Sequence, residues 1–185
     1  KNKQMNLKNL SNRFEKLSPQ QKRTVNLLTN WWNTARPKQI IEEQDDINIH
    51  MFLAGRGFGK TLTLNYDLLQ YALTNDNVIV GVVAPTYGDL KRIIFDGDSG
   101  LLKIIDRELL APAGYNKSNN EIRFWNGSRI QGFPAIEPDR LRGVQFHRIG
   151  LDELASYRYR ETFDNIQLAL RLGENPKMVI TTTPR

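Results

Sequence analysis

The sequence contains no cysteine and only two histidines among its 185 residues. Without thiols it can form neither disulfides nor thiolate-ligated metal sites, which suits a reducing compartment. No apolar run approaches the roughly 20 residues that a helix needs to cross a bilayer, so we expect no membrane partner. Charged residues make up 25% and hydrophobic residues 39%, as in an ordinary globular domain. The formal net charge of +6 suits a polyanion such as nucleic acid.

The hydrophobic pattern predicts a single domain in which strands alternate with helices. Short apolar runs at 47–54 and 78–84 are typical of central strands buried on both faces. Further strands are expected at 146–151, where Arg148 is an unusual polar insertion, and at 178–181. Apolar spacing and capping residues predict helices at 3–17, 19–36, 61–73, 87–110 (with a break at 97–100) and 158–172.

Two alternating runs joined by Asn126-Gly127 predict a β-hairpin, because Asn-Gly favours the tight turn that connects antiparallel strands. The alternation of strands and helices elsewhere predicts a mostly parallel sheet flanked by helices. The expected fold class is therefore α/β, with a β-hairpin inserted before the strand at 146–151.

The segment Ala54–Thr61 matches the phosphate-binding loop pattern, with alanine at the first position instead of the usual glycine. It lies between a predicted strand and a predicted helix, as the pattern requires. Glycines let the backbone N–H groups approach phosphate, and the helix N-terminus favours negative charge. Lysine neutralises the β- and γ-phosphates, and the threonine hydroxyl ligates Mg²⁺. The candidate nucleotide-binding residues are Gly55, Arg56, Gly57, Phe58, Gly59, Lys60, Thr61 and Leu62.

An acidic pair, Asp152-Glu153, follows the strand predicted at 146–151. An aspartate at this point holds Mg²⁺, and an adjacent glutamate polarises the attacking water in motor-type ATPases. A GTPase would carry Asp-x-x-Gly and a guanine-binding Asn-Lys-x-Asp, and Asn116-Lys117-Ser118-Asn119 lacks the final carboxylate. The pattern indicates an ATPase that uses ATP and Mg²⁺.

The last predicted strand ends in three consecutive hydroxyls, Thr181, Thr182 and Thr183. In NTPases with a catalytic glutamate, the strand after the acidic pair inserts beside the strand of the phosphate loop. We therefore expect these hydroxyls beside the γ-phosphate, where they can sense its loss.

Together these motifs resemble one family, the large terminase subunit of tailed bacteriophages, over its N-terminal ATPase domain. The resemblance covers nearly all of the chain after about residue 17 and rests on the order and spacing of short motifs. Besides the loop, the acidic pair and the closing threonines, the matching segments are Val83-Ala84-Pro85-Thr86, Asp98-Ser99-Gly100-Leu101-Leu102, Asn126-Gly127-Ser128 and Pro138-Asp139-Arg140-Leu141-Arg142-Gly143.

The resemblance implies roles that the residues alone do not. Thr181–Thr183 are similar to the coupling motif that links hydrolysis to movement, and Arg56 to a loop arginine that responds to nucleotide state. Arg142 resembles the arginine that one subunit of a ring inserts into its neighbour's site, where a guanidinium stabilises the transferring phosphoryl group. Gln20 or Gln21 resembles the adenine-contacting glutamine.

The implied function is an ATPase that drives double-stranded DNA into a procapsid in the host cytoplasm. The implied partners are DNA, further copies of the chain in a ring, the portal protein and the small terminase subunit. Two alternatives stay open at this point. One is a helicase-like translocase, which shares Pro85-Thr86 and the acidic pair, and the other is a non-hydrolysing P-loop regulatory module.

We expect one ATPase domain over the whole chain, with a helical segment at about 1–36 and a core at about 47–185. Terminase large subunits continue into a lid and a nuclease domain with clustered carboxylates. The sequence stops at Arg185 and carries no such cluster, so we expect neither of those domains and no DNA cleavage.

Overall fold

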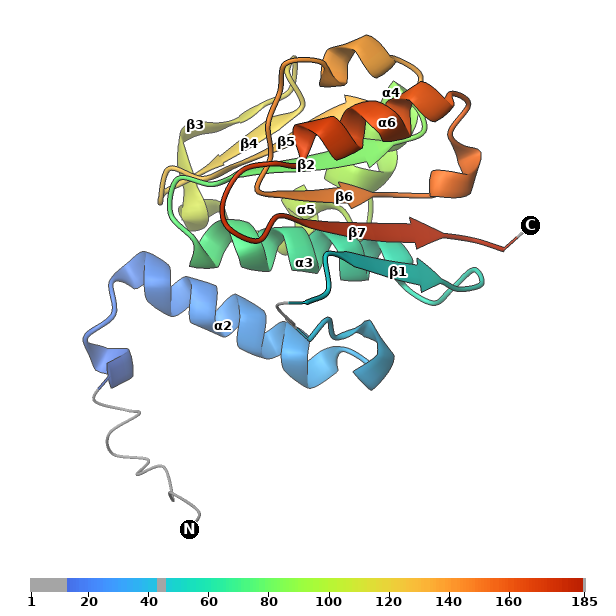
Figure 1. Cartoon of the computed structure of the whole chain (residues 1–185). Coiled ribbons are helices and arrows are strands. Elements are labelled where there is room, and N and C mark those ends of the chain that lie inside the picture. Colours follow the sequence, from blue (N-terminus) through green and yellow to red (C-terminus); the bar gives the residue numbers. More distant parts are fainter. Residues whose placement is uncertain (1–12, 43–45, 185) are drawn as a thin grey trace.

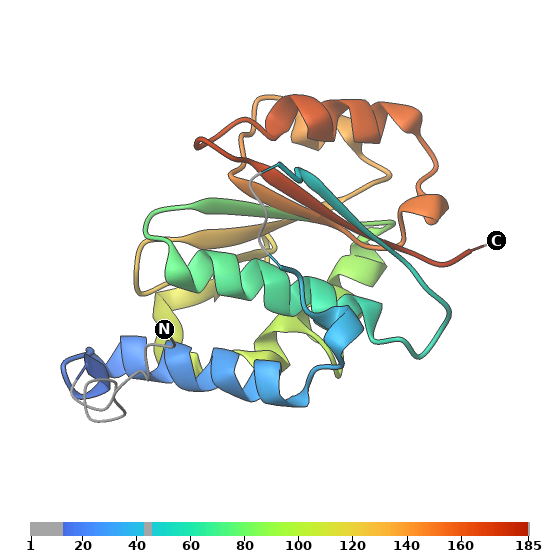
Figure 2. The ribbon, with the colours of Figure 1, turned by 60° about the horizontal axis from the view of Figure 1, so that its bottom comes forward.

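The structure is a computed structural model that describes residues 13–42 and 46–184, so most of the helix predicted at 3–17 lies outside the described residues. The described chain forms three layers, with a seven-stranded sheet between helices on either face (Figures 1 and 2). The predicted α/β fold with a mostly parallel sheet is confirmed.

The strand order across the sheet is β1-β7-β6-β2-β5-β4-β3. The strands from β1 to β5 in this order run parallel, and β4 runs antiparallel to both of its neighbours. As predicted, β7 lies between β1 and β6, so the carboxyl ends of these three strands meet at one edge. The strands are β1 (Ile49–Leu53), β2 (Ile79–Ala84), β3 (Leu110–Asn116), β4 (Glu121–Phe124), β5 (Arg129–Pro134), β6 (Arg148–Leu151) and β7 (Lys177–Thr182).

Successive residues of the central strands point to opposite faces of the sheet and are apolar on both, so helices cover both faces. Leu64 and Leu68 of α3 pack in a core with Val82 of β2, and Ile166 of α6 packs in a second core with Leu151 of β6. The helices are α2 (Pro19–Thr34), α3 (Lys60–Thr74), α4 (Tyr87–Asp89), α5 (Leu101–Ile104) and α6 (Arg160–Ala169), with short 3-10 or π turns η1 (Pro37–Gln39), η2 (Leu90–Phe95), η3 (Arg107–Leu109), η4 (Pro138–Leu141) and η5 (Leu154–Ser156).

Helix α2 begins at the predicted Ser18-Pro19 signal and lies outside α3 (Figure 2). The Ser18 hydroxyl accepts from the N–H of Gln21 at 3.1 Å, and the Gln21 side chain accepts from the N–H of Ser18 at 2.9 Å, which completes a capping box. The Trp31 ring stacks on Tyr66 of α3, with ring centroids 4.3 Å apart. These contacts fix the helix whose far end leads into η1.

The prediction that the strand at 47–54 is central and buried on both faces is wrong. The strand β1 forms, but it is the last strand at one side of the sheet (Figure 1). The side chains of Ile49, Met51 and Leu53 are 49%, 55% and 63% exposed. An apolar run predicts a strand, but the identity of its neighbours depends on non-local pairing that the run does not encode.

The hairpin prediction is confirmed, and the hairpin extends the main sheet rather than standing apart from it. Strands β4 and β5 pair antiparallel, and β5 pairs in parallel with β2. Strand β3, which pairs with β4, was not predicted. Its sequence contains Pro112 and Gly114, which weaken the strand signal but are tolerated at the edge of a sheet.

The Asn126-Gly127-Ser128 motif caps the carboxyl end of α3. The Asn126 amide donates to the carbonyls of Ala72 and Asn75 at 2.9 and 3.0 Å, and the Ser128 hydroxyl donates to Asn75 at 2.6 Å. These bonds satisfy carbonyls that a helix end leaves without partners. The hairpin thus holds one end of the helix that begins at the phosphate loop.

Candidate functional site

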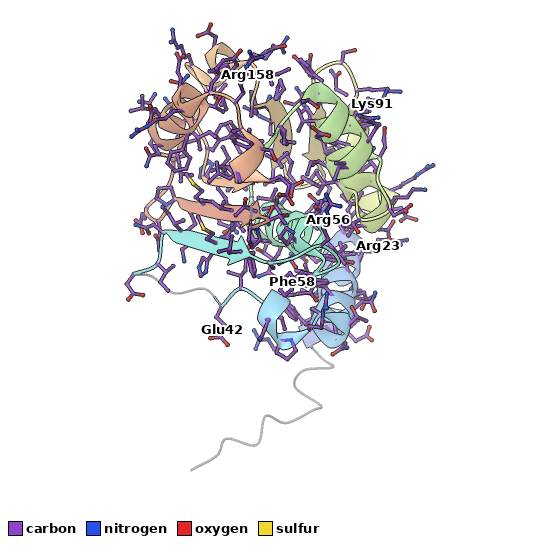
Figure 3. The ribbon with its side chains drawn as sticks, turned by 90° about the vertical axis from the view of Figure 1, so that its right-hand side faces the viewer. Arg23, Glu42, Arg56, Phe58, Lys91 and Arg158 are labelled. Atoms are coloured by element: carbon purple, nitrogen blue, oxygen red, sulfur yellow. The ribbon has the colours of Figure 1, made fainter. Side chains whose placement is uncertain are left out.

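The phosphate loop connects the end of β1 at Leu53 to the start of α3 at Lys60. Gly57 and Gly59 adopt left-handed backbone conformations, with φ of +78° and +83°, which residues other than glycine rarely adopt. Figure 3 looks onto the edge of the sheet where the carboxyl ends of β1, β7 and β6 meet, with the loop near the middle and Arg158 and Lys91 near the top. The predicted loop therefore stands at the start of a 15-residue helix, where backbone N–H groups favour an anion.

Lys60 is only 7% exposed, and its ammonium group is held by the loop itself. Its Nζ donates to the carbonyls of Ala54 and Gly55 at 2.9 and 3.2 Å. The same nitrogen lies 3.5 Å from Oε1 of Glu153. The predicted phosphate-binding lysine and water-activating glutamate are therefore adjacent in the fold.

Asp152 follows the fully buried strand β6 and is 3% exposed. Its Oδ1 accepts from the hydroxyl of Thr181 at 2.7 Å and from that of Thr61 at 3.3 Å. A hydroxyl and a carboxylate oxygen so close together suit Mg²⁺, which binds one or two carboxylates and keeps its other positions for water and phosphate. Thr61 and Asp152 are thus the residues that could hold the ion.

Burial raises the pKa of the Asp152 carboxyl above its ordinary value, and the charge of Glu153 raises it further. Hydrogen bonds from Thr181 and Thr61, together with the charge of Lys60, act in the opposite direction. Because the net shift is upward, folding favours the protonated carboxyl. The ionised Asp152 therefore destabilises the free protein at neutral pH.

We predict that Asp152→Asn is more stable than the wild type at neutral pH without nucleotide or Mg²⁺. The amide oxygen can still accept from Thr181, and the substitution removes the buried negative charge at position 152. The wild type loses stability as the pH rises through the raised pKa, so the gap should close below about pH 3.9, where the carboxyl is neutral in both states. Urea unfolding across pH measures the gap, with exposed Asp98→Asn as the control. An Asp152→Asn protein less stable than wild type at neutral pH would contradict this account.

Glu153 has left-handed backbone angles, φ 51° and ψ 51°, which are costly for a residue with a side chain. Its carboxylate is held on both oxygens by one residue. The hydroxyl of Thr183 donates to Oε1 at 2.8 Å, and the N–H of Thr183 donates to Oε2 at 3.1 Å. The backbone bend and these two bonds aim the carboxylate toward Lys60.

The three closing threonines contact three different points of the acidic segment. Thr181 donates to Asp152, Thr183 donates to Glu153, and the hydroxyl of Thr182 accepts from the N–H of Ala155 at 3.2 Å. The tip of β7 is therefore bonded, residue by residue, to the segment that follows β6. A movement of either segment must be transmitted to the other or break these bonds.

A protein family described as "Terminase large subunit, T4likevirus-type, N-terminal" matches residues 51–185, which includes the loop, the acidic pair and the threonine tip. The chain belongs to this terminase family. No curated protein matches this terminase sequence.

Solved terminase structures share the fold. The large terminase of the HK97 bacteriophage is 17% identical with a TM-score of 0.61, over 90% of this chain and 33% of that one. A large terminase from a thermophilic bacteriophage is 16% identical with a TM-score of 0.60 in its complex with ADP, over 87% of this chain and 38% of that one. In its complex with ATP-γ-S it is 18% identical with a TM-score of 0.55, over 87% and 37%. This terminase chain therefore spans between a third and two fifths of their length.

Some predicted site residues of this terminase lie apart from the cluster. Arg142 is exposed and pairs with Asp139, at 3.2 Å, and with Glu161 at the start of α6. Gln20 and Gln21 lie at the start of α2, roughly 20 Å along the helix from its far end. The structure does not bring these glutamines to the loop, and the Gln21 oxygen is used in the capping box.

Sequence reasoning missed two residues that do contact the loop, Arg36 and Gln39 of the segment between α2 and β1. Both donate to the carbonyl of Phe58. The signal for them was weak, because neither residue type nor spacing marks a known motif.

Among the described residues, no helix is long and apolar enough to cross a membrane. The same residues contain no group of three or more acidic or histidine side chains that could hold a metal ion on its own.

Proposed function

We propose that the chain is the Mg²⁺-dependent ATPase core of a motor that drives double-stranded viral DNA into a procapsid. The observation that carries this proposal is the convergence of Lys60, Thr61, Asp152 and Glu153 at the carboxyl edge of β1, β7 and β6. Membership of the terminase family supports the motor function. The complexes of a terminase with ADP and ATP-γ-S support nucleotide as the ligand of this fold.

ATP binds with its phosphates against the loop. The ammonium of Lys60 exchanges its two loop carbonyls for phosphate oxygens, which are stronger acceptors because they are charged. The N–H groups of the loop and of the first turn of α3, as far as Leu62, face the phosphates. Thr61 and Asp152 hold Mg²⁺, which neutralises charge on the phosphates when bound.

Glu153 accepts a proton from the water whose oxygen bonds to the γ-phosphorus, while the bond from that phosphorus to the bridging oxygen breaks and ADP leaves. In the free protein both carboxylate oxygens of Glu153 accept hydrogen bonds from Thr183, so part of their capacity to accept from water is already used. Engagement with water weakens the bonds to Thr183, and the tip of β7 responds. The hydroxyl row from Thr181 to Thr183 thereby couples hydrolysis to the position of the chain that follows.

Arg142 acts on the site of a neighbouring copy in a ring. Within its own chain it is 63% exposed and is held by two carboxylates on the α6 side of the sheet. An exposed guanidinium oriented by a salt bridge is suited to enter a second subunit's site and stabilise the phosphoryl group in transfer. Arg56, exposed in the loop, lies where it can respond to the nucleotide state. The motor acts at the portal of the procapsid, with the small terminase subunit and the portal protein as partners.

Mixed oligomers test this function. Arg142→Ala and Glu153→Ala subunits should each lose ATP hydrolysis in the presence of duplex DNA. Mixing the two should restore activity in part, because some interfaces then combine an intact arginine with an intact glutamate. The measurement is steady-state phosphate release as a function of the mixing ratio, together with a strand-separation assay on the same DNA.

A mixture of wild type with the double variant, which carries both changes in one subunit, is the matched control, since it adds no intact interface. No recovery at any ratio would remove the role of Arg142 in trans. Separation of the DNA strands would favour a helicase over a packaging motor.

A further inference from the structure

The outer side of the phosphate loop is held by two side chains, which we call the Arg36–Gln39 clamp. Arg36 Nη2 and Gln39 Nε2, the latter at 3.1 Å, both donate to the carbonyl oxygen of Phe58. The guanidinium also lies over the Phe58 ring, 5.3 Å from its centroid. One loop carbonyl therefore receives two hydrogen bonds, one of them from a charged group.

The clamp is internally bonded as well. Gln39 Oε1 accepts from the backbone N–H of Arg36 at 3.0 Å and from its Nε at 3.2 Å. Gln39 is only 5% exposed, and its orientation is set by these bonds. A Cβ added to Gly59 would lie 2.7 Å from Gln39 Nε2, so the loop packs directly against the amide. Gly59 is therefore required both for its positive φ and for this close approach.

Peptide geometry transmits this contact to the nucleotide side of the loop. The C=O of Phe58 and the N–H of Gly59 belong to one planar trans peptide group and point in opposite directions. A carbonyl fixed on the outer side fixes the Gly59 N–H on the inner side. That N–H precedes Lys60, at the N-terminus of α3 where phosphate binds.

We propose that Arg36 and Gln39 are positioning residues that orient the Phe58–Gly59 peptide so that its N–H donates to bound phosphate. The proposal rests on the proposed function, in which this loop binds ATP. In this role Gln39 supports binding of the phosphates through the loop and does not contact the adenine base. A glutamine amide can also pair with adenine, and the two roles make opposite predictions for a ligand without a base.

The test is calorimetric titration of the protein with MgATP, MgGTP and magnesium tripolyphosphate, which carries the phosphates alone. The variants are Gln39→Leu, which removes the donor at similar size, and Arg36→Ala, which removes an exposed guanidinium and leaves Gln39 in place. Gln167→Leu, at an exposed position of α6, is the matched control. Arg36→Lys keeps a cationic donor and should recover part of the affinity.

Both clamp variants should weaken all three ligands by a similar factor, about 3- to 10-fold, which corresponds to one net hydrogen bond. In steady-state hydrolysis KM should rise while kcat changes little, because the clamp acts on binding and not on the attacking water. A general loss of folding would instead lower kcat together with the melting temperature.

A loss for MgATP with tripolyphosphate unchanged would overturn the proposal and assign Gln39 to adenine. Unchanged affinities in both Gln39→Leu and Arg36→Ala would overturn it as well. Lys60→Ala distinguishes failure of the clamp proposal from failure of the proposed function. If it abolishes binding while the clamp variants do not, only the clamp fails, and if it also leaves binding unchanged, the proposed function fails with it.

Discussion

Replacing Arg148 with alanine is expected to lower the free energy of unfolding by about 3–5 kcal/mol. Arg148 is 1% exposed at the start of β6 and forms a two-pronged ion pair with Asp67 of α3, at 2.8 and 2.6 Å. Its guanidinium also lies 5.1 Å from the centroid of the Tyr71 ring. Alanine would leave the Asp67 carboxylate buried without this partner, which costs more than the lost contact itself.

The ion pair joins the two elements that carry the chemistry. Helix α3 begins with Lys60, and β6 leads into Asp152, so the pair ties the helix of the phosphate loop to the strand of the acidic segment. Its loss should therefore reduce nucleotide binding as well as stability. Replacing both partners with apolar residues, as in Arg148→Met with Asp67→Leu, should recover much of the stability because neither charge of the pair is then buried.

Urea unfolding measures the effect as a shift of the midpoint at constant slope. Arg23→Ala is the matched control, because Arg23 also forms ion pairs, with Asp106 and Glu108, but at the surface. Solvent screens that pair, so its loss should move the midpoint much less. Equal shifts for Arg148→Ala and Arg23→Ala would contradict the role assigned to the buried pair.

Arg148 also marks the limit of what the sequence reveals. A polar residue in an apolar strand is visible as an anomaly, but its partner lies 81 positions away and follows no spacing rule. The same limit applies to β1, whose apolar residues predict a strand but not its place at the side of the sheet. Local chemistry is encoded in local pattern, and pairing between distant segments is not.

In the candidate site, too, local patterns are predictable from the sequence and contacts between distant segments are not. The sequence predicts Lys60, Thr61, Asp152 and Glu153, because phosphate and Mg²⁺ chemistry requires those residue types at fixed points of a strand–loop–helix unit. It also predicts that the threonine tip adjoins the acidic pair, since the order of strands in such sheets is regular. It does not predict which threonine bonds to which partner, as these contacts depend on side-chain geometry.

The Arg36–Gln39 clamp escaped prediction for a different reason. Arginine and glutamine near a proline are common at the surface, and only the path of the chain from α2 into β1 brings them to Phe58. The glutamines that the family resemblance suggested, Gln20 and Gln21, lie at the other end of the same helix. Contact with the loop distinguishes Gln39 from Gln20 and Gln21.

The second large effect concerns Glu153. Glu153→Gln should lower the rate of ATP hydrolysis by about 10²- to 10⁴-fold, because an amide cannot accept the proton of the attacking water. Affinity for MgATP should be kept or increased. The substitution removes a negative charge near the γ-phosphate and frees Lys60 from a carboxylate 3.5 Å away. The amide oxygen can accept from the Thr183 N–H, and the amide nitrogen can donate to the Thr183 hydroxyl, so both contacts with Thr183 can be kept.

The role of Glu153 is tested by single-turnover hydrolysis of radiolabelled ATP, with binding measured on the same samples. Glu174→Gln, at an exposed position before β7, serves as the control and should behave as wild type. We predict that Glu153→Gln binds MgATP at least as tightly as wild type while its hydrolysis falls by at least about a hundredfold. Hydrolysis close to the wild-type rate at full occupancy would mean that Glu153 does not activate the water.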